Sequence, residues 1–547
     1  MDQTSDNSQT KEMLDILRGL NDRLTRIENY LNITPKITEE NSEGKTVPKA
    51  KSEKDEELEF KIGQYWFAKL GIFVFLIGCL IANTLPFEGI NQIIPSAVGF
   101  VLGLGLIATG QIGKNRIPYL QGYLLGSGFV ILFLASVRLH YFSADPIIKN
   151  SIIVLPIIYI LSGLIVFAAV KRNSPYLTAL GITAIAIAAL IGDSPYLIFL
   201  TLIAVSITGS YLKIKFNWHV LLSFTIGLTY FIHLLWFINN PLMGNELKII
   251  SDLPLNLLFI LIYNVIYSLS FQIDKNYEEN LVSGTGIFIN TALGYGLFLL
   301  ITILSSPSNA QLYNLFASII FLVFAITFFT KKESRMATFF YAMTGYGALS
   351  IAIILQFNKP DYFLWLCWQS ILVISTAVWF RSKFIIVANF FIYLLIFLAF
   401  LVITGTTGGI SLSFGIASLL SARILNWRKD RLELKTEQMR NAYLLTALLI
   451  IPYSLYHLFP SGLVAIAWIV VAILYYLLSI ILKNIKYRWM SLATFLLTVL
   501  YVFVIGITSS ETSYKILSFL VLGAALIILS VIYARNRNKS SSIEEKK

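Results

Sequence analysis

Four side chains near the ends of long apolar segments are the best candidates for chemistry in this chain. Arg138 and His140 end one apolar segment, His233 lies late in another, and His457 closes a third. A planar guanidinium binds phosphate through paired hydrogen bonds, and an imidazole exchanges a proton near neutral pH. One hypothesis is therefore a catalytic site at the outer face of a membrane, in which Arg138 binds an anionic headgroup or phosphate and His140 or His233 transfers a proton. The alternative is that Arg138 extends toward the lipid headgroups and the histidines pack at the interface.

Carboxylates are absent from the apolar interior, where most ion-coupled carriers need one. None of the thirty Asp and Glu residues lies well inside an apolar segment. Because an ionisable residue inside a membrane usually marks an ion pathway, this distribution argues against proton- or sodium-coupled transport. The polar side chains inside the segments are neutral, namely Asn264, Asn290, Gln369 and Asn389. We expect them to form hydrogen bonds between helices rather than to contact a substrate.

The two cysteines, Cys79 and Cys367, stand alone inside apolar runs, without a second Cys or a His at metal-ligand spacing. This placement predicts packing residues and not a metal centre, a haem or a disulfide. The chain contains no P-loop, dinucleotide-binding fingerprint, HExxH or GxSxG motif. We therefore expect no metal, no cofactor and no nucleic-acid partner.

The elements that must position these residues are membrane helices. Hydrophobic residues make up 56% of the 547 residues and charged residues only 13%, with a mean hydropathy of +0.73. A water-facing surface needs about 25% charged residues, and a helix crosses the hydrocarbon core with about 20 apolar residues. The pattern predicts an all-α, polytopic transmembrane bundle of about eighteen spans. We place them at 66–84, 93–112, 118–138, 151–170, 175–192, 195–212, 218–238, 252–271, 281–304, 310–330, 336–356, 361–380, 383–404, 408–427, 440–459, 461–482, 488–508 and 513–534.

The basic residues between the spans predict how the chain is oriented. Alternate junctions, beginning with the one that holds Lys114 and Arg116, contain twenty-one Lys and Arg residues, whereas the other junctions contain five. Cytoplasmic loops of membrane proteins carry this excess of positive charge. We therefore expect the rich junctions and both termini to be cytoplasmic, with residues 535–547 forming a short basic tail. The net charge of +12 is then chiefly a sign of orientation.

The segment before the first span divides into two parts. Residues 1–33 carry a heptad pattern that alternates spacings of three and four, through Leu17, Leu20, Leu24, Ile27 and Leu31. This pattern favours a short cytoplasmic coiled coil through which the chain forms homo-oligomers, and the alternative is an amphipathic helix lying on the membrane. Residues 34–60 are rich in Lys, Glu, Ser and Pro, which predicts a disordered polar linker before the transmembrane domain at 61–534.

Short repeated motifs suggest how the spans are arranged. LGYG at 293–296 and TGYG at 344–347 are two spans apart, and G-x3-G-x-G occurs at 99–105 and again at 122–128. Glycines at such spacing let helix backbones approach closely. We therefore expect an array of helical hairpins.

The first third of the transmembrane region resembles a known family. The run EFKIGQYWFAKLGIFVFLIG is followed by a span with Gly122, Gly126 and Gly128, by FLASVRLHYF and by tightly spaced hairpins. These features are similar to those of the large polytopic bacterial membrane proteins classed as domain of unknown function 2339, over about residues 59–240. The resemblance implies a bacterial inner-membrane protein with an N-terminal coiled coil and a polar linker. It implies no activity, cofactor or catalytic residue.

Three functions fit these observations. The first is a non-catalytic envelope or scaffold protein whose N-terminal helix self-associates or recruits partners. The second is a transporter or lipid flippase without an embedded coupling carboxylate, and the third is an outer-face transferase acting on a lipid-linked substrate. A continuous aqueous cavity would favour transport, a blind outer pocket with Arg138 and His233 would favour the transferase, and a closed bundle would favour the scaffold.

Overall fold

The computed structural model describes most of residues 66–506, together with isolated residues between 516 and 527. Within the first range, the gaps are 86–90, 116–117, 143–144, 252, 254, 405–408 and 428–435. The predicted coiled coil at 1–33, the linker at 34–60, the basic tail and most of the expected span 513–534 lie outside the described residues.

All the regular structure in the described residues is helical, as expected. Sixteen of these helices are long and apolar enough to cross a membrane, and the shorter apolar helix Pro175–Ile191 belongs to the same series. Each of the first seventeen expected spans corresponds to one helix, and every helix begins within four residues of the expected position. The helices are α3 (Phe67–Thr84), α4 (Ile93–Ile112), α5 (Pro118–Arg138), α6 (Ser151–Lys171), α7 (Pro175–Ile191), α8 (Pro195–Phe216), α9 (His219–Phe237), α10 (Asn256–Ile273), α11 (Leu281–Ser305), α12 (Ala310–Lys332), α13 (Arg335–Gln356), α14 (Asp361–Trp379), α15 (Lys383–Thr404), α16 (Gly409–Trp427), α17 (Thr436–Leu458), α18 (Ser461–Ile481) and α19 (Ile485–Tyr501).

Local sequence explains where several helices begin. The Ser174 hydroxyl accepts a hydrogen bond from Leu177 N at the start of α7, and Pro175 occupies the first helical position. A side-chain oxygen satisfies one of the free N–H groups of a first turn, and proline has none to lose there. The turn before α7 contains Asn173 in the left-handed conformation, with φ of 53°. Ser174 and Pro175 thus form the N-terminus of α7, directly after this turn.

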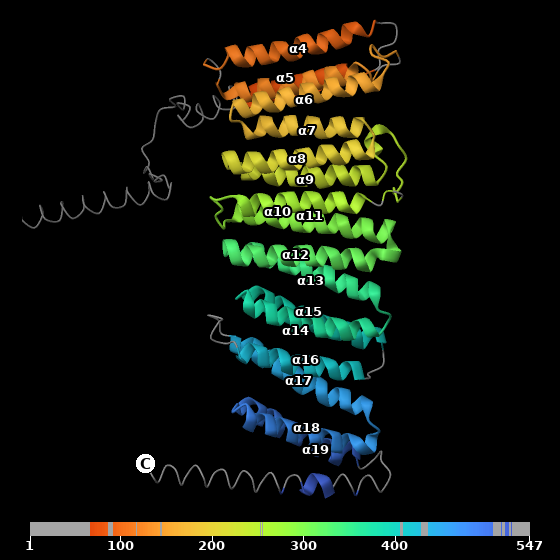
Figure 1. Cartoon of the computed structure of the whole chain (residues 1–547), viewed down its shortest axis with the longest axis vertical. Helices are drawn as coiled ribbons and strands as arrows, with labels where there is room; N and C mark the ends of the chain where they lie inside the picture. Colours follow the sequence, from red (N-terminus) through yellow and green to blue (C-terminus); the bar gives the residue numbers. More distant parts are fainter. Residues whose placement is uncertain are drawn as a thin grey trace, which may run out of the picture. The chain divides into compact units, whose positions relative to one another are not determined.

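Helices adjacent in the sequence pack as hairpins. The most extensive pairings join α4 with α5, α12 with α13, and α16 with α17, and further contacts join α9 with α11 and α14 with α16. Figure 1 shows these helices lying side by side in chain order. α4 and α5 approach each other closely, because a Cβ built on Gly128 would lie 2.8 Å from the carbonyl oxygen of Gly103. Small residues permit this contact, and the expected hairpin arrangement is confirmed.

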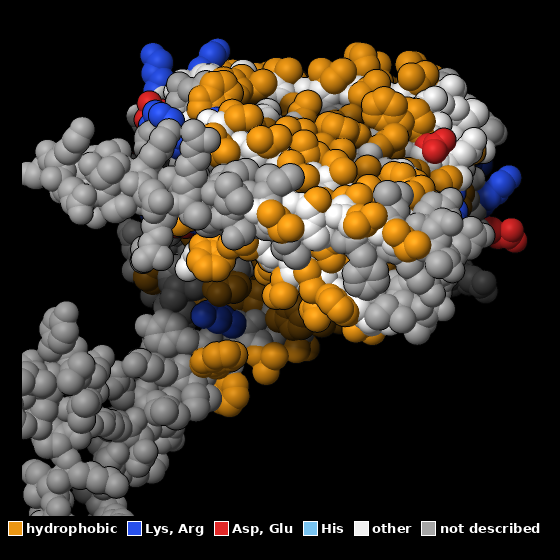
Figure 2. Space-filling model, turned by 90° about the horizontal axis from the view of Figure 1, so that it is seen from below, with side chains coloured by type: hydrophobic (Ala, Val, Ile, Leu, Met, Phe, Trp, Pro, Cys, Tyr) orange, Lys and Arg blue, Asp and Glu red, His pale blue; other side chains and the backbone are white. Residues whose placement is uncertain are grey.

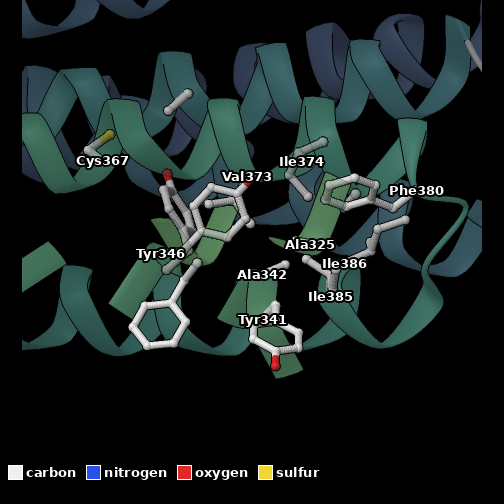
Figure 3. Close-up of a cluster of buried hydrophobic side chains, with 14 of the residues drawn as sticks. Ala325, Tyr341, Ala342, Tyr346, Cys367, Val373, Ile374, Phe380, Ile385 and Ile386 are labelled. Carbon is white, nitrogen blue, oxygen red and sulfur yellow. The ribbon is translucent and has the colours of Figure 1, made fainter. Parts of the chain in front are cut away.

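The interior of the domain is filled by aliphatic and aromatic side chains. Figure 3 shows one part of it, where Tyr346 of α13 lies near Val373 of α14, while Tyr341 of α13 points away from α14 and stacks on Phe328 of α12. On the outside, large apolar side chains are exposed along most helices; Val402 is an example. Figure 2 shows such side chains over the middle of one face, with Lys, Arg, Asp and Glu toward its edges. An apolar band bounded by charge is the surface that a bilayer requires.

Candidate functional site

Arg138 is the last residue of α5, and its side chain is buried against the end of α3. Its Nη1 donates hydrogen bonds to the carbonyl oxygens of Ala82, Asn83 and Leu85 at 3.3, 2.6 and 3.0 Å, and Nη2 donates to Gln92 Oε1 at 3.3 Å. A helix C-terminus leaves carbonyls without intrahelical partners and favours positive charge. Arg138 therefore joins α5 to α3, which gives it a structural role beside the predicted headgroup contact.

The two histidines of the outer-face hypothesis have separate partners. His140 follows α5, and its Nδ1 lies 2.7 Å from Ile148 O. His233 of α9 is fully buried, with its Nε2 2.5 Å from Asn256 Oδ1 of α10 and its ring stacked on that of Phe199 at 4.8 Å. The arginine thus bonds to the end of α3 and to Gln92, His140 bonds to Ile148, and His233 bonds to Asn256 of α10.

Polar side chains near the middle of α10, α11 and α13 bond to one another. The Ser268 hydroxyl oxygen accepts hydrogen bonds from Asn290 Nδ2 at 3.1 Å and from the Tyr341 hydroxyl at 2.6 Å. We call these three residues the first polar triad. It extends to Tyr230, whose hydroxyl donates to Asn290 Oδ1 at 2.8 Å, and to Asn264, whose Nδ2 donates to Asn290 O at 3.0 Å. Four helices, α9, α10, α11 and α13, are therefore tied together by buried hydrogen bonds.

A second triad with the same three residue types and the same spacing of helices lies four helices later, with Asn389 and not the serine at its centre. In the second polar triad, Asn389 of α15 donates its Nδ2 to the Ser370 hydroxyl of α14 at 2.8 Å and to the Tyr443 hydroxyl of α17 at 3.0 Å. The first triad takes its Ser, Asn and Tyr from α10, α11 and α13, so the order and spacing of the helices are equal. Gln369 also bonds between helices, because its Nε2 donates to Tyr346 O of α13 at 2.9 Å. The expectation that all four embedded amides join helices is confirmed.

The tyrosines of the two GYG motifs have matching roles. The Tyr295 hydroxyl of α11 donates to Asn314 Oδ1 of α12 at 2.9 Å. The Tyr346 hydroxyl of α13 bonds to the Thr376 hydroxyl of α14. Each tyrosine thus connects its helix to the next helix in the chain, which gives the repeated motif a structural function.

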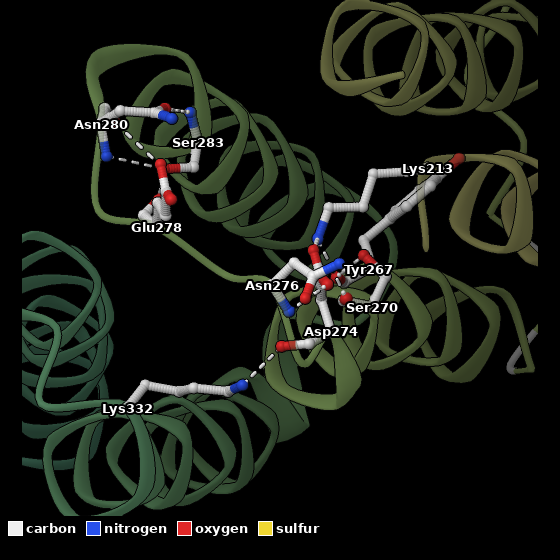
Figure 4. A network of polar contacts seen from close by, with 9 residues as sticks. All are labelled: Lys213, Tyr267, Ser270, Asp274, Asn276, Glu278, Asn280, Ser283 and Lys332. Atoms are coloured by element: carbon white, nitrogen blue, oxygen red, sulfur yellow. Dashed lines mark hydrogen bonds and ion pairs between the residues drawn. The ribbon is translucent and has the colours of Figure 1, made fainter. Parts of the chain in front are cut away.

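A buried ion pair lies where α8 and α10 end. Lys213 Nζ is 2.5 Å from Asp274 Oδ2, and the two side chains are 0% and 3% exposed. The ammonium also donates to Ser270 O at 3.3 Å, and Asp274 Oδ1 accepts from Asn276 N at 2.9 Å. Figure 4 shows the pair together with Lys332 of α12, whose Nζ donates to Asp274 O at 2.6 Å. Three helices, α8, α10 and α12, meet at this one acidic residue.

The electrostatics keep the Asp274 carboxylate ionised. Burial by itself would raise the pKa of Asp274, but hydrogen bonds from Lys213 and from the Asn276 N–H, with the nearby positive charge, outweigh it and hold that pKa below its ordinary value of 3.8. The carboxylate is therefore ionised at neutral pH and shields the buried ammonium. This arrangement is suited to holding helix ends together rather than to exchanging protons.

This ion pair is not apparent from the sequence. Lys213 was expected in a loop beyond a span ending at residue 212, as one of the orientation charges, but α8 continues to Phe216 and buries it. Asp274 was expected in a junction, and it caps α10 there with its side chain buried. The two residues are 61 positions apart and belong to no common sequence motif. The pair becomes visible only when α8 and α10 are packed against each other.

Neither a metal site nor a related protein was found that would identify a function. Within the described residues, no group of three or more His, Cys, Asp or Glu side chains could hold a metal ion. No family model matches the chain, and neither a curated protein nor a solved structure matches it.

Proposed function

We propose that this protein is a non-catalytic scaffold of the bacterial cytoplasmic membrane. The observation that carries the proposal is that the embedded polar side chains bond to one another. Both polar triads and the Gln369 contact use side chains that a transporter would need to turn toward a substrate or an ion. A bundle tied in this way is suited to holding a fixed surface, because opening a path through it would break buried hydrogen bonds.

The surroundings of His233 and Arg138 favour the same scaffold function. The His233 ring is covered by Phe199, Trp236 and Tyr263, with centroid distances of 4.8, 5.7 and 5.8 Å. A reacting imidazole must contact its substrate, and this one is enclosed by aromatic rings. Arg138 is likewise committed to carbonyls of α3. These contacts support a packing role for the candidates of the transferase hypothesis.

The scaffold would act through its N-terminal segment. The heptad pattern from Leu17 to Leu31 favours self-association, and the basic junctions favour placing both termini in the cytoplasm. The resemblance to domain of unknown function 2339 over residues 59–240 is consistent with a bacterial envelope protein of this kind. On this proposal, the helical bundle anchors the N-terminal segment to the membrane. The coiled coil then joins copies of the chain into oligomers or recruits partner proteins.

Aqueous accessibility of the triads tests the proposal. Ser268→Cys and Ser370→Cys are made in a Cys79→Ala, Cys367→Ala background, and intact vesicles and detergent-solubilised protein are treated with a charged maleimide. We expect no labelling at either triad position, because both side chains are buried among packed helices. Lys149→Cys, at a position whose side chain is 83% exposed, is the positive control. Rapid labelling at Ser268 or Ser370 would indicate an aqueous path and refute the closed scaffold.

Cross-linking tests the N-terminal role. Leu24→Cys occupies the predicted a position, and Asp22→Cys occupies the f position, on the far side of the helix. In the same cysteine-free background, mild oxidation should convert the Leu24 variant to a disulfide dimer and leave the Asp22 variant monomeric. Equal cross-linking of the two variants, or none in either, would overturn self-association through this seam.

A further inference from the structure

Basic side chains from three helices gather where α16 ends and where α17 and α19 begin. Lys486 of α19 donates a hydrogen bond from Nζ to Glu437 Oε1 of α17 at 2.7 Å, and Arg440 Nη2 of α17 donates to the same oxygen at 3.2 Å. Arg423 of α16 and Arg440 both interact electrostatically with the hydroxyl of Tyr487 on α19. The basic cluster, as we call it, consists of Arg423, Arg440, Lys486 and Tyr487.

The basic cluster carries more positive charge than its neighbours neutralise. Among the described residues, Glu437 is the one carboxylate that pairs with its three cations, which leaves a net charge of +2. The sequence between α16 and α17, residues 428–435, holds four Lys and Arg against two Asp and Glu and adds a further +2. The end of α8 differs, because Asp274 there neutralises Lys213. A concentration of one sign of charge at the surface attracts ions of the opposite sign.

The basic cluster also contains hydrogen-bond donors without acceptors. Within the described part of the chain, the Arg423 guanidinium makes no ion pair or hydrogen bond, although the residue is only partly exposed. Tyr487 is 5% exposed, and its hydroxyl likewise bonds to no described residue. The Nε of Arg440 is buried without a partner. Because guanidinium groups only donate hydrogen bonds, the ligand that fits this cluster is an acceptor with negative charge, such as a phosphate.

The position of the basic cluster indicates that the phosphate belongs to a lipid. Trp427, the last residue of α16, is 68% exposed, and Trp489, two residues after Tyr487 on α19, is 67% exposed. Exposed tryptophans at helix ends are typical of the headgroup level of a bilayer, where the phosphodiesters of phospholipids lie. Further along α19, the side chains of Leu496 and Leu500 are exposed. They give the acyl chains of a lipid an apolar surface beyond the cluster.

We propose that the basic cluster binds the phosphodiester of an anionic phospholipid, with the Arg423 guanidinium and the Tyr487 hydroxyl donating to its oxygens. A planar guanidinium can donate two parallel hydrogen bonds to a phosphate. Arg440 and Lys486, which Glu437 holds in place, add positive charge that attracts the lipid. The same charge repels the choline of a zwitterionic lipid, so phosphatidylglycerol is preferred over phosphatidylcholine. This site adds a lipid partner to the proposed scaffold and does not depend on its self-association.

The chain offers variants that distinguish a site from general positive charge. Arg423→Gln removes the guanidinium and one charge, whereas Arg423→Lys keeps the charge and loses the paired donors. Tyr487→Phe removes the hydroxyl and keeps the ring. Lys483→Gln is the matched control, because Lys483 is an exposed cation three residues before Lys486. Its substitution changes the net charge by the same amount as Arg423→Gln.

Native mass spectrometry of the purified full-length protein is the test. Each protein is incubated with equimolar dioleoyl phosphatidylglycerol and phosphatidylcholine, and the bound lipids are counted after partial delipidation. Wild type and Lys483→Gln should retain phosphatidylglycerol in preference to phosphatidylcholine. Arg423→Gln should lower that preference by about 10-fold and Tyr487→Phe by about 5-fold, as expected for the loss of hydrogen bonds to a charged acceptor. Arg423→Lys should give a loss between those of wild type and Arg423→Gln.

Competition distinguishes a lipid from a free phosphate. Inorganic phosphate, or glycerophosphoglycerol, which is the same headgroup without acyl chains, is added in large molar excess to wild type loaded with phosphatidylglycerol. Neither should displace the lipid, because its acyl chains also contact the apolar surface of the domain. Displacement by inorganic phosphate would show that the basic cluster takes a free anion and would overturn the lipid assignment.

Two further results would overturn the proposal. An equal loss of preference in Lys483→Gln and Arg423→Gln would show that general positive charge attracts the lipid. An undiminished preference in Arg423→Gln and Tyr487→Phe would place the lipid elsewhere. These two substitutions lie on different helices, so a folding defect in one, detected from its melting temperature in the same detergent, leaves the other to decide the outcome.

Discussion

Breaking the ion pair between Lys213 and Asp274 should be among the most destabilising changes in the transmembrane domain. Lys213→Met preserves the length of the side chain and leaves the Asp274 carboxylate buried without its cation. Removing one partner of a buried pair costs about 3–5 kcal/mol, because the remaining charge is desolvated and uncompensated. The lower end of that range is expected here, because Asp274 keeps its hydrogen bond from Asn276 N. Lys215→Met, two residues further along α8 and exposed, should change the free energy of unfolding by less than about 0.5 kcal/mol.

The assay is reversible unfolding in mixed micelles of mild detergent and sodium dodecyl sulfate, monitored by circular dichroism. A double variant, Lys213→Met with Asp274→Leu, completes a mutant cycle. It should recover most of the stability lost by either single change, since replacing both charges with apolar groups is often close to neutral. The reasoning fails if Lys213→Met unfolds like Lys215→Met, or if the double variant loses the sum of the two single losses.

The same pair predicts a pH dependence. The pKa of Asp274 is depressed in the folded protein, so its contribution to stability is fully present above the ordinary carboxyl pKa of 3.8 and is lost as the pH falls below that value. Wild-type stability should therefore show a loss below about pH 4 that the double variant lacks. A loss of equal size in both proteins would assign the acid sensitivity to other carboxylates.

Two further predictions concern the packing of the helices. Gly103→Leu should destabilise the α4–α5 hairpin by about 1–3 kcal/mol, because a Cβ there would lie 2.8 Å from the side chain of Leu132 and 3.1 Å from Gly128 O. Gly105→Leu is the control. A Cβ at Gly105 meets nothing within 4 Å, so this variant should be tolerated in the same unfolding assay. Asn389→Leu should cost about 1–2 kcal/mol by leaving its triad partners without a donor, and a thermal melt unchanged from wild type would show that the second polar triad does not join the helices energetically.

Hydropathy predicted the helices well because the bilayer sets their length. The starts of the first seventeen expected spans agree with the structure, including short junctions such as that before Pro175. The embedded amides were predicted to join helices for a related reason, since a polar group in hydrocarbon must find a partner. Their particular partners were not predictable, because a serine, an asparagine and a tyrosine on three helices carry no common sequence pattern.

The charged residues show where sequence reasoning stopped. Lys213 and Lys215 are two residues apart and read alike as loop cations, yet one is buried in an ion pair and the other is exposed. The difference depends on which side of α8 faces α10. Successive residues on a helix turn by about 100°, so only the packed orientation of the helix decides between them.

By itself, therefore, the sequence determined that the chain forms an all-helical membrane domain, about how many spans it has and where each begins, because lipid imposes length and apolarity on every span. The tertiary structure alone decided which polar groups meet: the two triads, the buried ion pair, and His233 with Asn256. Those contacts join residues tens of positions apart across helix faces, and a one-dimensional pattern of hydropathy does not specify which faces touch.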